Sequence, residues 1–269
     1  MEADLKLASM QEIGSEFACR RRGQTLKAGC IYKMDCLEGM TLLPASSIDM
    51  ILSDLPYGKT ANPWDSVIDL DRLWREYRRL IHPNGAIVLM AQCPFDKALG
   101  MSNRKWLRYE WIWEKSRGTG FYNARCAPLN AHENILVFYD RRPAYNPQLA
   151  PGKPYITVHK EYLSRNMGKR IESYITHNSG FRYPRSVLRF KSEAKTHHPT
   201  QKPIALFEYL VRTYTQPGDL VLDNCMGSGT TAIACLNTGR RFIGFELDPE
   251  HHRFAKDRVM KRLKELGQN

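Results

Sequence analysis

Short apolar runs alternate with amphipathic segments along most of the chain. The runs have the length of strands, and the amphipathic segments repeat their apolar residues at helical spacing. In the segment 69–80 this spacing gives one apolar helical face: Leu70, Leu73, Trp74, Tyr77 and Leu80. We expect the turn residues at 82–85 to end that helix. The pattern predicts strands at 30–35, 48–54, 85–91, 109–115, 133–140, 219–225 and 241–247, and helices at 36–44, 69–80, 95–102, 204–215, 230–239 and 248–267.

This alternation predicts a parallel, doubly wound α/β sheet of the Rossmann-like type, with an α+β arrangement as the alternative. Residues 1–28 form a polar lead-in, which we expect to be partly mobile. Between 141 and 197 the periodicity gives way to Pro, Tyr, Arg and Asn. We therefore expect one main domain, 29–140 and 198–269, interrupted by a small insert at 141–197. A chain of 269 residues, 42% of them hydrophobic, is long and apolar enough for such a core.

No apolar run approaches the roughly 18 residues of a membrane span, and the first residues lack the basic-then-apolar pattern of a signal peptide. We expect a soluble, cytoplasmic protein. The seven cysteines include no C-x-x-C pair, which argues against a disulfide framework and a sulfur-rich zinc site. We expect reduced thiols and no bound metal.

Positive charge is concentrated in the insert. The chain carries 40 Lys and Arg against 28 Asp and Glu, a net charge of +12. From Asp140 to Lys202 there are thirteen basic and four acidic residues, so +9 of the excess lies in under a quarter of the chain. Such a segment indicates a polyanionic partner, because neutralising phosphates releases counterions. A basic surface without a partner is the alternative.

The apolar strand predicted at 48–54 leads directly into Asp54-Leu55-Pro56-Tyr57-Gly58. Pro56 and Gly58 suit a turn, because proline presets φ and glycine tolerates positive φ. A turn calls for neither an acid nor an aromatic ring. Asp54 and Tyr57 are therefore candidates for chemistry.

A glycine-bearing turn, "DNCMGSGTT" (223–231), joins a predicted strand to a predicted helix. Gly227 and Gly229 would let the backbone approach a ligand, and Glu246 ends the next strand, where such folds bind a ribose diol. A dinucleotide site prefers a third glycine, and Asp223 would repel a pyrophosphate. A cofactor with a nucleoside and an amino-acid tail but no phosphate fits better. The alternative is a turn that only connects strand to helix.

Together these motifs resemble those of the S-adenosylmethionine-dependent DNA amino-methyltransferases. That family has the catalytic tetrapeptide Asp/Asn/Ser-Pro-Pro-Tyr/Phe and a glycine-bearing cofactor loop, to which "DLPYG" and "DNCMGSGTT" are similar. The order of catalytic motif, basic insert and cofactor loop resembles the beta group. The segments 118–140 and "HPTQKP" (198–203) are typical of that group, especially of its phage and prophage members. The resemblance extends from Ile31 to Arg258.

Two departures from the family pattern stand out. Leu55 replaces the first proline of the tetrapeptide, and Asn224-Cys225 replaces the usual Pro-Phe of the cofactor loop. Neither change removes a charged or stacking group, so we expect activity to survive. If a main-chain carbonyl does the accepting, the side chain of Leu55 should be free to vary.

The resemblance implies a Rossmann-like methyltransferase sheet with the catalytic half before the cofactor half, and a role for each matching residue. Asp54 and the carbonyl of Leu55 or Pro56 would accept the two hydrogens of a target amine, and Tyr57 would stack on the base. For Asp35, expected at the cofactor's adenine, a helix N-cap is an equal alternative. The implied S-adenosylmethionine-binding residues are Asp35, Thr200, Lys202, Asp223, Gly227, Gly229 and Glu246.

Double-stranded DNA is the implied substrate, with the target base flipped out of the duplex. Aspartate at the first motif position favours the N6 amine of adenine over the N4 amine of cytosine. The insert would read the site with arginines that bond either guanines or phosphates: Arg165, Arg170, Arg182, Arg185 and Arg189. The interleaved tyrosines, which would form a small core or touch bases, are Tyr145, Tyr155, Tyr162 and Tyr174. The family pattern also suggests a homodimer, and a cognate restriction endonuclease is a further candidate partner.

Three rival functions compete with this hypothesis. An RNA or protein amino-methyltransferase is disfavoured by Asp54, where the glutamine-modifying enzymes have asparagine, and by the late basic insert. A DNA-binding homologue without catalysis has no need for the intact acids and glycines. A nicotinamide-dependent oxidoreductase is disfavoured by the missing third glycine.

Overall fold

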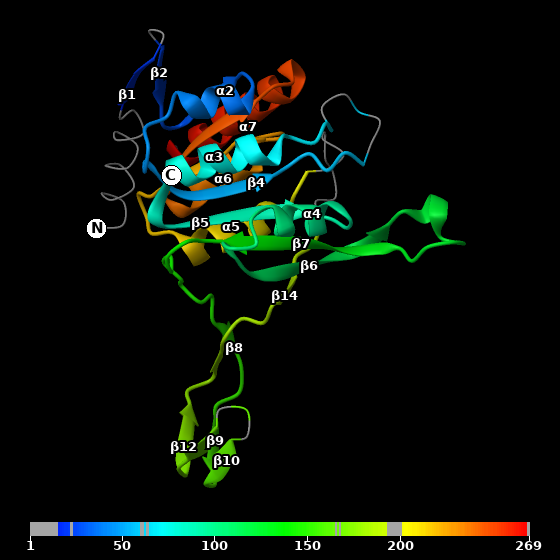
Figure 1. Cartoon of the computed structure of the whole chain (residues 1–269), viewed down its shortest axis with the longest axis vertical. Coiled ribbons are helices and arrows are strands. Elements are labelled where there is room, and N and C mark those ends of the chain that lie inside the picture. The colour runs from blue at the N-terminus through cyan, green and yellow to red at the C-terminus, as the bar shows by residue number, and fades with distance from the viewer. Residues whose placement is uncertain are drawn as a thin grey trace. The chain divides into compact units, whose positions relative to one another are not determined.

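In the computed structural model, residues 16–21, 24–59, 62, 65–164, 166, 168–192 and 201–267 are described. They build an eight-stranded sheet in the order β14-β6-β7-β5-β4-β15-β16-β3 (Figure 1). Its strands are β3 Cys30–Lys33, β4 Ile48–Asp54, β5 Ile81–Ala91, β6 Leu107–Thr119, β7 Asn130–Phe138, β14 Val187–Arg189, β15 Leu220–Asp223 and β16 Arg241–Glu246. Every recorded neighbour pair in this sheet is parallel except those of β7. The predicted doubly wound α/β class is confirmed.

Helices cover both faces of the sheet, as a sheet with parallel, near-continuous apolar strands requires. One buried cluster contains Leu73 and Leu99 of the helices and Ile51 and Ile87 of the sheet. A second contains Leu210 and Ala232 with the neighbouring strand residues that point the other way. The helices are α2 Cys36–Thr41, α3 Leu70–Leu80, α4 Phe95–Ser102, α5 Ile204–Tyr214, α6 Thr230–Thr238 and α7 Pro249–Gly267, with the 3-10 turn η1 Phe121–Asn123.

Helix α3 forms because its apolar residues match the helical period and its first turn is capped. The Asp69 carboxylate accepts from the backbone N–H groups of Asp71 and Arg72, at 3.0 and 3.1 Å. The side chains of Leu73, Trp74, Tyr77 and Leu80 are buried, and Leu70 is half-buried. The helix ends at Leu80, close to the predicted boundary.

One local prediction needs correction. The turn expected at 82–85 lies inside β5, where the ladder to β4 shifts register between Ile48 and Met50. Gly85 suits this irregularity, because a Cβ there would lie 2.7 Å from the Asp49 carbonyl oxygen. In the lead-in 1–28, the described part forms a hairpin of β1 Glu16–Arg21 and β2 Gln24–Lys27.

The chain divides into two compact units. The second unit spans Pro147–Arg185, within the insert that the sequence places at 141–197. It contains three antiparallel ribbons, β8 Ala150–Pro151 with β13 Phe181–Arg182, β9 Tyr155–His159 with β12 Tyr174–Asn178, and β10 Tyr162–Ser164 with β11 Lys169–Ile171. None of its described apolar side chains is buried.

Strand β14 belongs to the first unit and pairs with β6, although the sequence places it in the insert. Across the described residues, no helix has the length and apolar character needed to cross a membrane.

Candidate active site

Three acids meet at one edge of the sheet. Strands β4, β15 and β16 are parallel neighbours and end on Asp54, Asp223 and Glu246. Because parallel strands run in one direction, their carboxyl ends share an edge, and open α/β sheets bind ligands there. The tetrapeptide and the glycine loop, far apart in the sequence, thus form one site.

The tetrapeptide holds its acid and its ring together. The Tyr57 hydroxyl donates to Asp54 Oδ1 at 2.6 Å, and the Tyr57 ring is tilted against Phe95 with centroids 5.6 Å apart. Leu55 is buried within the apolar core. The expectation that its side chain is free to vary is wrong, because the core needs its apolar volume.

The backbone after the tetrapeptide is fixed by an acid that the motif did not include. Asp65 accepts from the N–H groups of Gly58 and Lys59, at 2.9 and 2.8 Å. Gly58 has φ +67°, which suits glycine. This local turn explains the glycine at position 58. It does not explain Asp54 and Tyr57, which lie at the carboxyl edge of the sheet.

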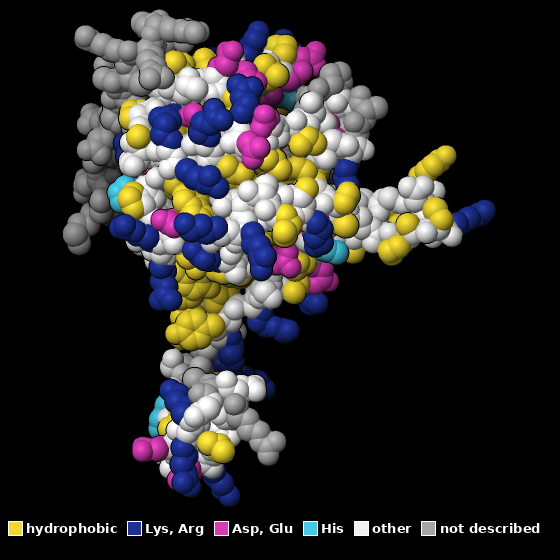
Figure 2. All heavy atoms as spheres, in the orientation of Figure 1, with side chains coloured by type: hydrophobic (Ala, Val, Ile, Leu, Met, Phe, Trp, Pro, Cys, Tyr) yellow, Lys and Arg dark blue, Asp and Glu magenta, His cyan; other side chains and the backbone are white. Residues whose placement is uncertain are grey.

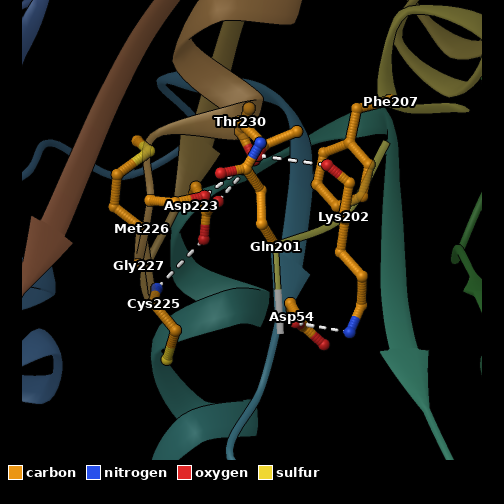
Figure 3. A pocket seen from close by; sticks show the side chains of 11 residues that line it. Asp54, Gln201, Lys202, Phe207, Asp223, Cys225, Met226, Gly227 and Thr230 are labelled. Atoms are coloured by element: carbon orange, nitrogen blue, oxygen red, sulfur yellow. Dashed lines mark hydrogen bonds and ion pairs between the residues drawn. The ribbon is translucent and has the colours of Figure 1, made fainter. Parts of the chain in front are cut away.

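A buried row of charges lies beside Asp54. The Lys202 ammonium is 2.8 Å from Asp54 Oδ2 (Figure 3). It is also 3.1 Å from Glu133 Oε2, and Lys115 Nζ is 2.8 Å from Glu133 Oε1. The side chains of Lys202, Lys115 and Glu133 are no more than 8% exposed. Two cations thus face two carboxylates, so that each buried charge has a partner, as burial demands.

The charges in this row control one another's protonation. Burial raises the pKa of Asp54, and attraction to Lys202 only partly offsets it. Burial also acts to raise the pKa of Glu133, but the ammonium groups of Lys202 and Lys115 outweigh it and lower that pKa. For Lys202, the two carboxylates overcome burial and raise the pKa. Lys202 is therefore a stable cation that favours the ionised form of both carboxyls, although burial still leaves the pKa of Asp54 above its usual value.

The glycine loop is held by the two other acids of the edge. Glu246 Oε2 accepts from the Gly227 N–H at 2.7 Å, and Asp223 Oδ1 accepts from Ser53 Oγ at 2.8 Å and the Cys225 N–H at 3.0 Å. Asp223 Oδ2 accepts from the Thr231 hydroxyl. These bonds connect the loop to β4, to β16 and to the start of α6.

A pocket with about 310 Å³ of empty space lies between the loop and Asp54. Figure 3 shows Lys202 reaching from beside Thr230 to Asp54 along its wall. The lining residues are Asp54, Gln201, Lys202, Phe207, Asp223, Cys225, Met226, Gly227, Ser228, Thr230 and Thr231. Burial raises the pKa of Asp223 in its wall to about 6, although the bonds from Thr231 and Ser53 oppose the shift.

The remaining predicted cofactor residues behave differently. Asp35 caps α2 by accepting from the Glu38 N–H at 3.1 Å, which is the N-cap alternative. Lys202 was expected at the cofactor carboxylate, and here its ammonium is bonded to Asp54 and Glu133. Thr200 lies outside the described residues. The cofactor roles of these three stay predictions.

The predicted DNA-binding arginines are not equivalent. Arg170 pairs with Glu161, and Arg189 pairs with Glu114 of β6 at 2.7 Å. Arg182 lies 4.7 Å above the Tyr155 ring, donates to the Lys153 carbonyl and so supports its own unit. Arg185 is exposed and forms no ion pair with a described residue. Arg165 lies outside the described residues.

The interleaved tyrosines form no core of the second unit. Tyr155, Tyr162 and Tyr174 are each more than 40% exposed. Tyr174 stacks on His159, with ring centroids 4.3 Å apart. Tyr145 belongs to the first unit, where it packs against Tyr214.

The sequence reasoning missed Glu133, Lys115 and Asp65. A signal for Glu133 was present, because an acid at the start of an otherwise apolar strand is costly unless it has a partner. Asn224, one of the two departures, also has a partner, since its side-chain oxygen accepts from the buried Tyr77 hydroxyl at 2.5 Å. No group of three potential metal ligands occurs among the residues that the structure describes.

The site and the fold agree with the family that the chain matches. The protein-family model described as DNA methylase, of the N6 and N4 type, matches residues 48–257 of this chain. The chain belongs to this family of DNA methylases. The family transfers a methyl group from S-adenosylmethionine to an amino group in DNA.

Individual relatives show the same kinship. The type II methyltransferase M.HpaI of Haemophilus parainfluenzae is 26% identical over 84% of this chain and 72% of its own length. The crystal structure of the M1.HpyAVI–SAM complex is 26% identical, covers 85% of this chain and 98% of its own, and has a TM-score of 0.60. The PvuII cytosine-N4-specific DNA methyltransferase, 15% identical with a TM-score of 0.61, covers 89% of this chain and 93% of its own and shares the fold.

Proposed function

We propose that this chain methylates the N6 amino group of adenine in double-stranded DNA. The observation that carries the proposal is the Asp54 carboxylate, held by Tyr57 and Lys202 at the mouth of a pocket that the glycine loop also lines. Aspartate at the first motif position favours adenine over cytosine. Methylation of cytosine N4 is the alternative, because both amines present the same two hydrogens.

The residues of the pocket fit S-adenosylmethionine. The described lining residues include two carboxylates, a glycine-bearing turn and one cation, Lys202, rather than a cluster of cations for a pyrophosphate, as suits a positively charged cofactor without phosphate. Glu246 would hold the ribose hydroxyls, and Asp223, Gly227 and Gly229 would line the methionine end. The cofactor supplies an electrophilic methyl group on its sulfonium.

Asp54 would make the target nitrogen nucleophilic. The lone pair of an exocyclic amine is delocalised into the ring, so the nitrogen reacts poorly until that pair is localised. Each carboxylate oxygen has two lone pairs, so Asp54 can accept an amine hydrogen while it keeps its bonds to Tyr57 and Lys202. The carbonyl of Leu55 or Pro56 would accept the second hydrogen. After transfer, Asp54 would take up the proton and release it to solvent.

Replacing the acid tests this assignment directly. Asp54→Ala should abolish methyl transfer, because no group then localises the lone pair, while titration calorimetry should still detect S-adenosylmethionine binding. DNA from cells expressing the wild-type chain should contain N6-methyladenine, as detected by liquid chromatography and mass spectrometry of its nucleosides. N4-methylcytosine in its place would select the alternative, and turnover of Asp54→Ala at the wild-type rate would overturn the mechanism. Modified-base sequencing of the same DNA would give the recognition site.

The homodimer and the partner endonuclease remain predictions from the family pattern. Sedimentation of the protein with and without DNA would test the first, and a monomer in both cases would reject it.

A further inference from the structure

The hairpin formed by residues 116–132, here called the arm, extends from the sheet beyond the support of its neighbours. Strand β14 pairs with β6 only as far as Glu114, and β5 pairs with β7 only from Asn134 onward. Outside these points, and among the described residues, β6 and β7 form strand pairs only with each other, with a register shift between Glu114 and Thr119. Figure 1 shows the arm projecting past the ends of the other strands.

The arm begins at the catalytic edge. Glu133, the residue that follows it, is bonded to Lys202, which is bonded to Asp54. From Glu133 to Asn130, β7 advances roughly 10 Å at the usual rise per residue, and η1 lies beyond that point. That length is comparable to the width of the DNA major groove, about 12 Å. A duplex whose target base reaches Asp54 would therefore lie within reach of the tip.

The tip presents two aromatic rings to solvent in an ordered turn. Phe121 is 69% exposed and Tyr122 is 98% exposed. The rings lie on η1, which starts at Gly120 with φ +90° and is closed by bonds from the N–H groups of Asn123 and Ala124. The next turn is closed by bonds to the Asn123 carbonyl oxygen. Exposed rings on an ordered turn indicate a surface that is covered by a partner.

The charge of the arm selects nucleic acid as that partner. Residues 116–132 include Arg117 and Arg125 and no acid, and Figure 2 shows hydrophobic and basic side chains along the arm. DNA offers phosphates to the arginines and base faces to the rings, because aromatic side chains stack on any base.

We propose that the arm inserts Phe121 and Tyr122 into the duplex beside the target base and so holds that base out of the helix. The proposal rests on the proposed function. A flipped base leaves a gap in the stack, and inserted apolar side chains stabilise such unstacked steps. The arginines would grip the adjoining phosphates.

The test compares a paired target with one that is already loosened. The rate of labelled methyl transfer is measured on a duplex carrying the recognition site, and on the same duplex with an abasic position opposite the target. Phe121→Ala, Tyr122→Ala and the double variant are compared with wild type. Met101→Ala is the matched control, because Met101 is a comparably exposed apolar residue (68%) on α4 and is not part of the arm.

We expect the double variant to lose tenfold or more on the paired duplex and less than threefold on the loosened duplex. Fluorescence of 2-aminopurine at the target position should report less flipping, while the thermal midpoint and S-adenosylmethionine affinity stay at wild-type values. Equal losses on both duplexes, or no loss, would overturn the proposal that Phe121 and Tyr122 hold the base out of the helix. Failure of the wild-type protein to methylate either duplex would overturn the proposed function instead.

Discussion

The catalytic edge and the second unit use opposite physical means. At the edge, Asp54, Glu133, Lys202 and Asp223 are held by bonds to one another or to the loop around them. In the unit Pro147–Arg185, short ribbons expose their rings and charges, and none of the described apolar side chains is buried. The edge holds the atoms of its charged side chains in fixed positions, whereas the unit exposes charged and aromatic side chains to solvent.

This difference predicts how each region responds to change. Buried charges depend on their partners, so removing one group should alter geometry and protonation together. Exposed charges act nearly independently and are screened by salt. Single substitutions should therefore have large effects at the edge and small, additive effects in the unit.

The largest effect is expected for Lys202→Met. The change leaves Asp54 and Glu133 facing each other with only Lys115 as compensation, so the pKa of both carboxyls should rise. The acid limb of kcat/KM against pH should move to higher pH by about one unit or more. Unfolding should become easier by about 3–5 kcal/mol, as measured by denaturant titration.

Lys97→Met is the control for that variant. Lys97 also pairs with an aspartate at 2.8 Å, but its own side chain is 71% exposed. The partner, Asp96, is buried and keeps bonds from the Asn134 side chain at 2.6 Å and from the Lys97 N–H at 2.8 Å when the ammonium is removed. Its loss should change stability by less than about 1 kcal/mol and leave the pH profile in place. Similar effects from both lysines would contradict the distinction between buried and exposed charge.

The glycine loop should respond to Gly229→Ala. Gly229 has φ +80°, and a Cβ there would lie 3.2 Å from Ala255 Cβ of α7. The added methyl group should destabilise the fold by about 1–2 kcal/mol and weaken S-adenosylmethionine binding. Gly227→Ala is the milder comparison, because φ is +51° and the nearest atom outside its chain neighbours is 3.9 Å away. Thermal unfolding measures the stability of the two variants, and calorimetry measures their affinity for S-adenosylmethionine. Equal effects of the two substitutions would show that the contact with α7 is not important.

Acid should weaken cofactor binding through Asp223, whose pKa is raised to about 6 by burial. Protonation below that pH removes the negative charge that a cationic ligand meets. The dissociation constant should rise about tenfold per pH unit below 6 if only the ionised form binds. Titration calorimetry between pH 5 and 8 measures this, and Asp223→Asn, which does not titrate, should flatten the curve. A dissociation constant independent of pH would show that Asp223 does not meet the cation.

The main sheet and the three acids of its edge follow from the sequence, because apolar periodicity and strand ends are local signals. The row Lys115–Glu133–Lys202 does not, since it depends on the antiparallel register of β7. The ribbons of the second unit were missed for a related reason. Strands of two to five residues have too little periodicity to be recognised, and their pairing joins distant segments. Burial of Leu55 likewise depends on tertiary packing.

The smallest effect is expected in the second unit, from Arg185→Ala. Arg185 is exposed and forms no ion pair with a described residue, so its guanidinium is available to a phosphate. Loss of one phosphate contact should reduce the slope of log affinity against log salt by about 0.9, with little change in fold stability. Arg182→Ala should instead loosen its own unit, because Arg182 is bonded to the Lys153 carbonyl and stacks over Tyr155. Fluorescence anisotropy with a duplex at several salt concentrations separates the two. An unchanged slope for Arg185→Ala would mean that this arginine contacts no phosphate. An unchanged slope for a variant that lacks all accessible arginines of the second unit would show that the second unit is not a DNA-binding surface.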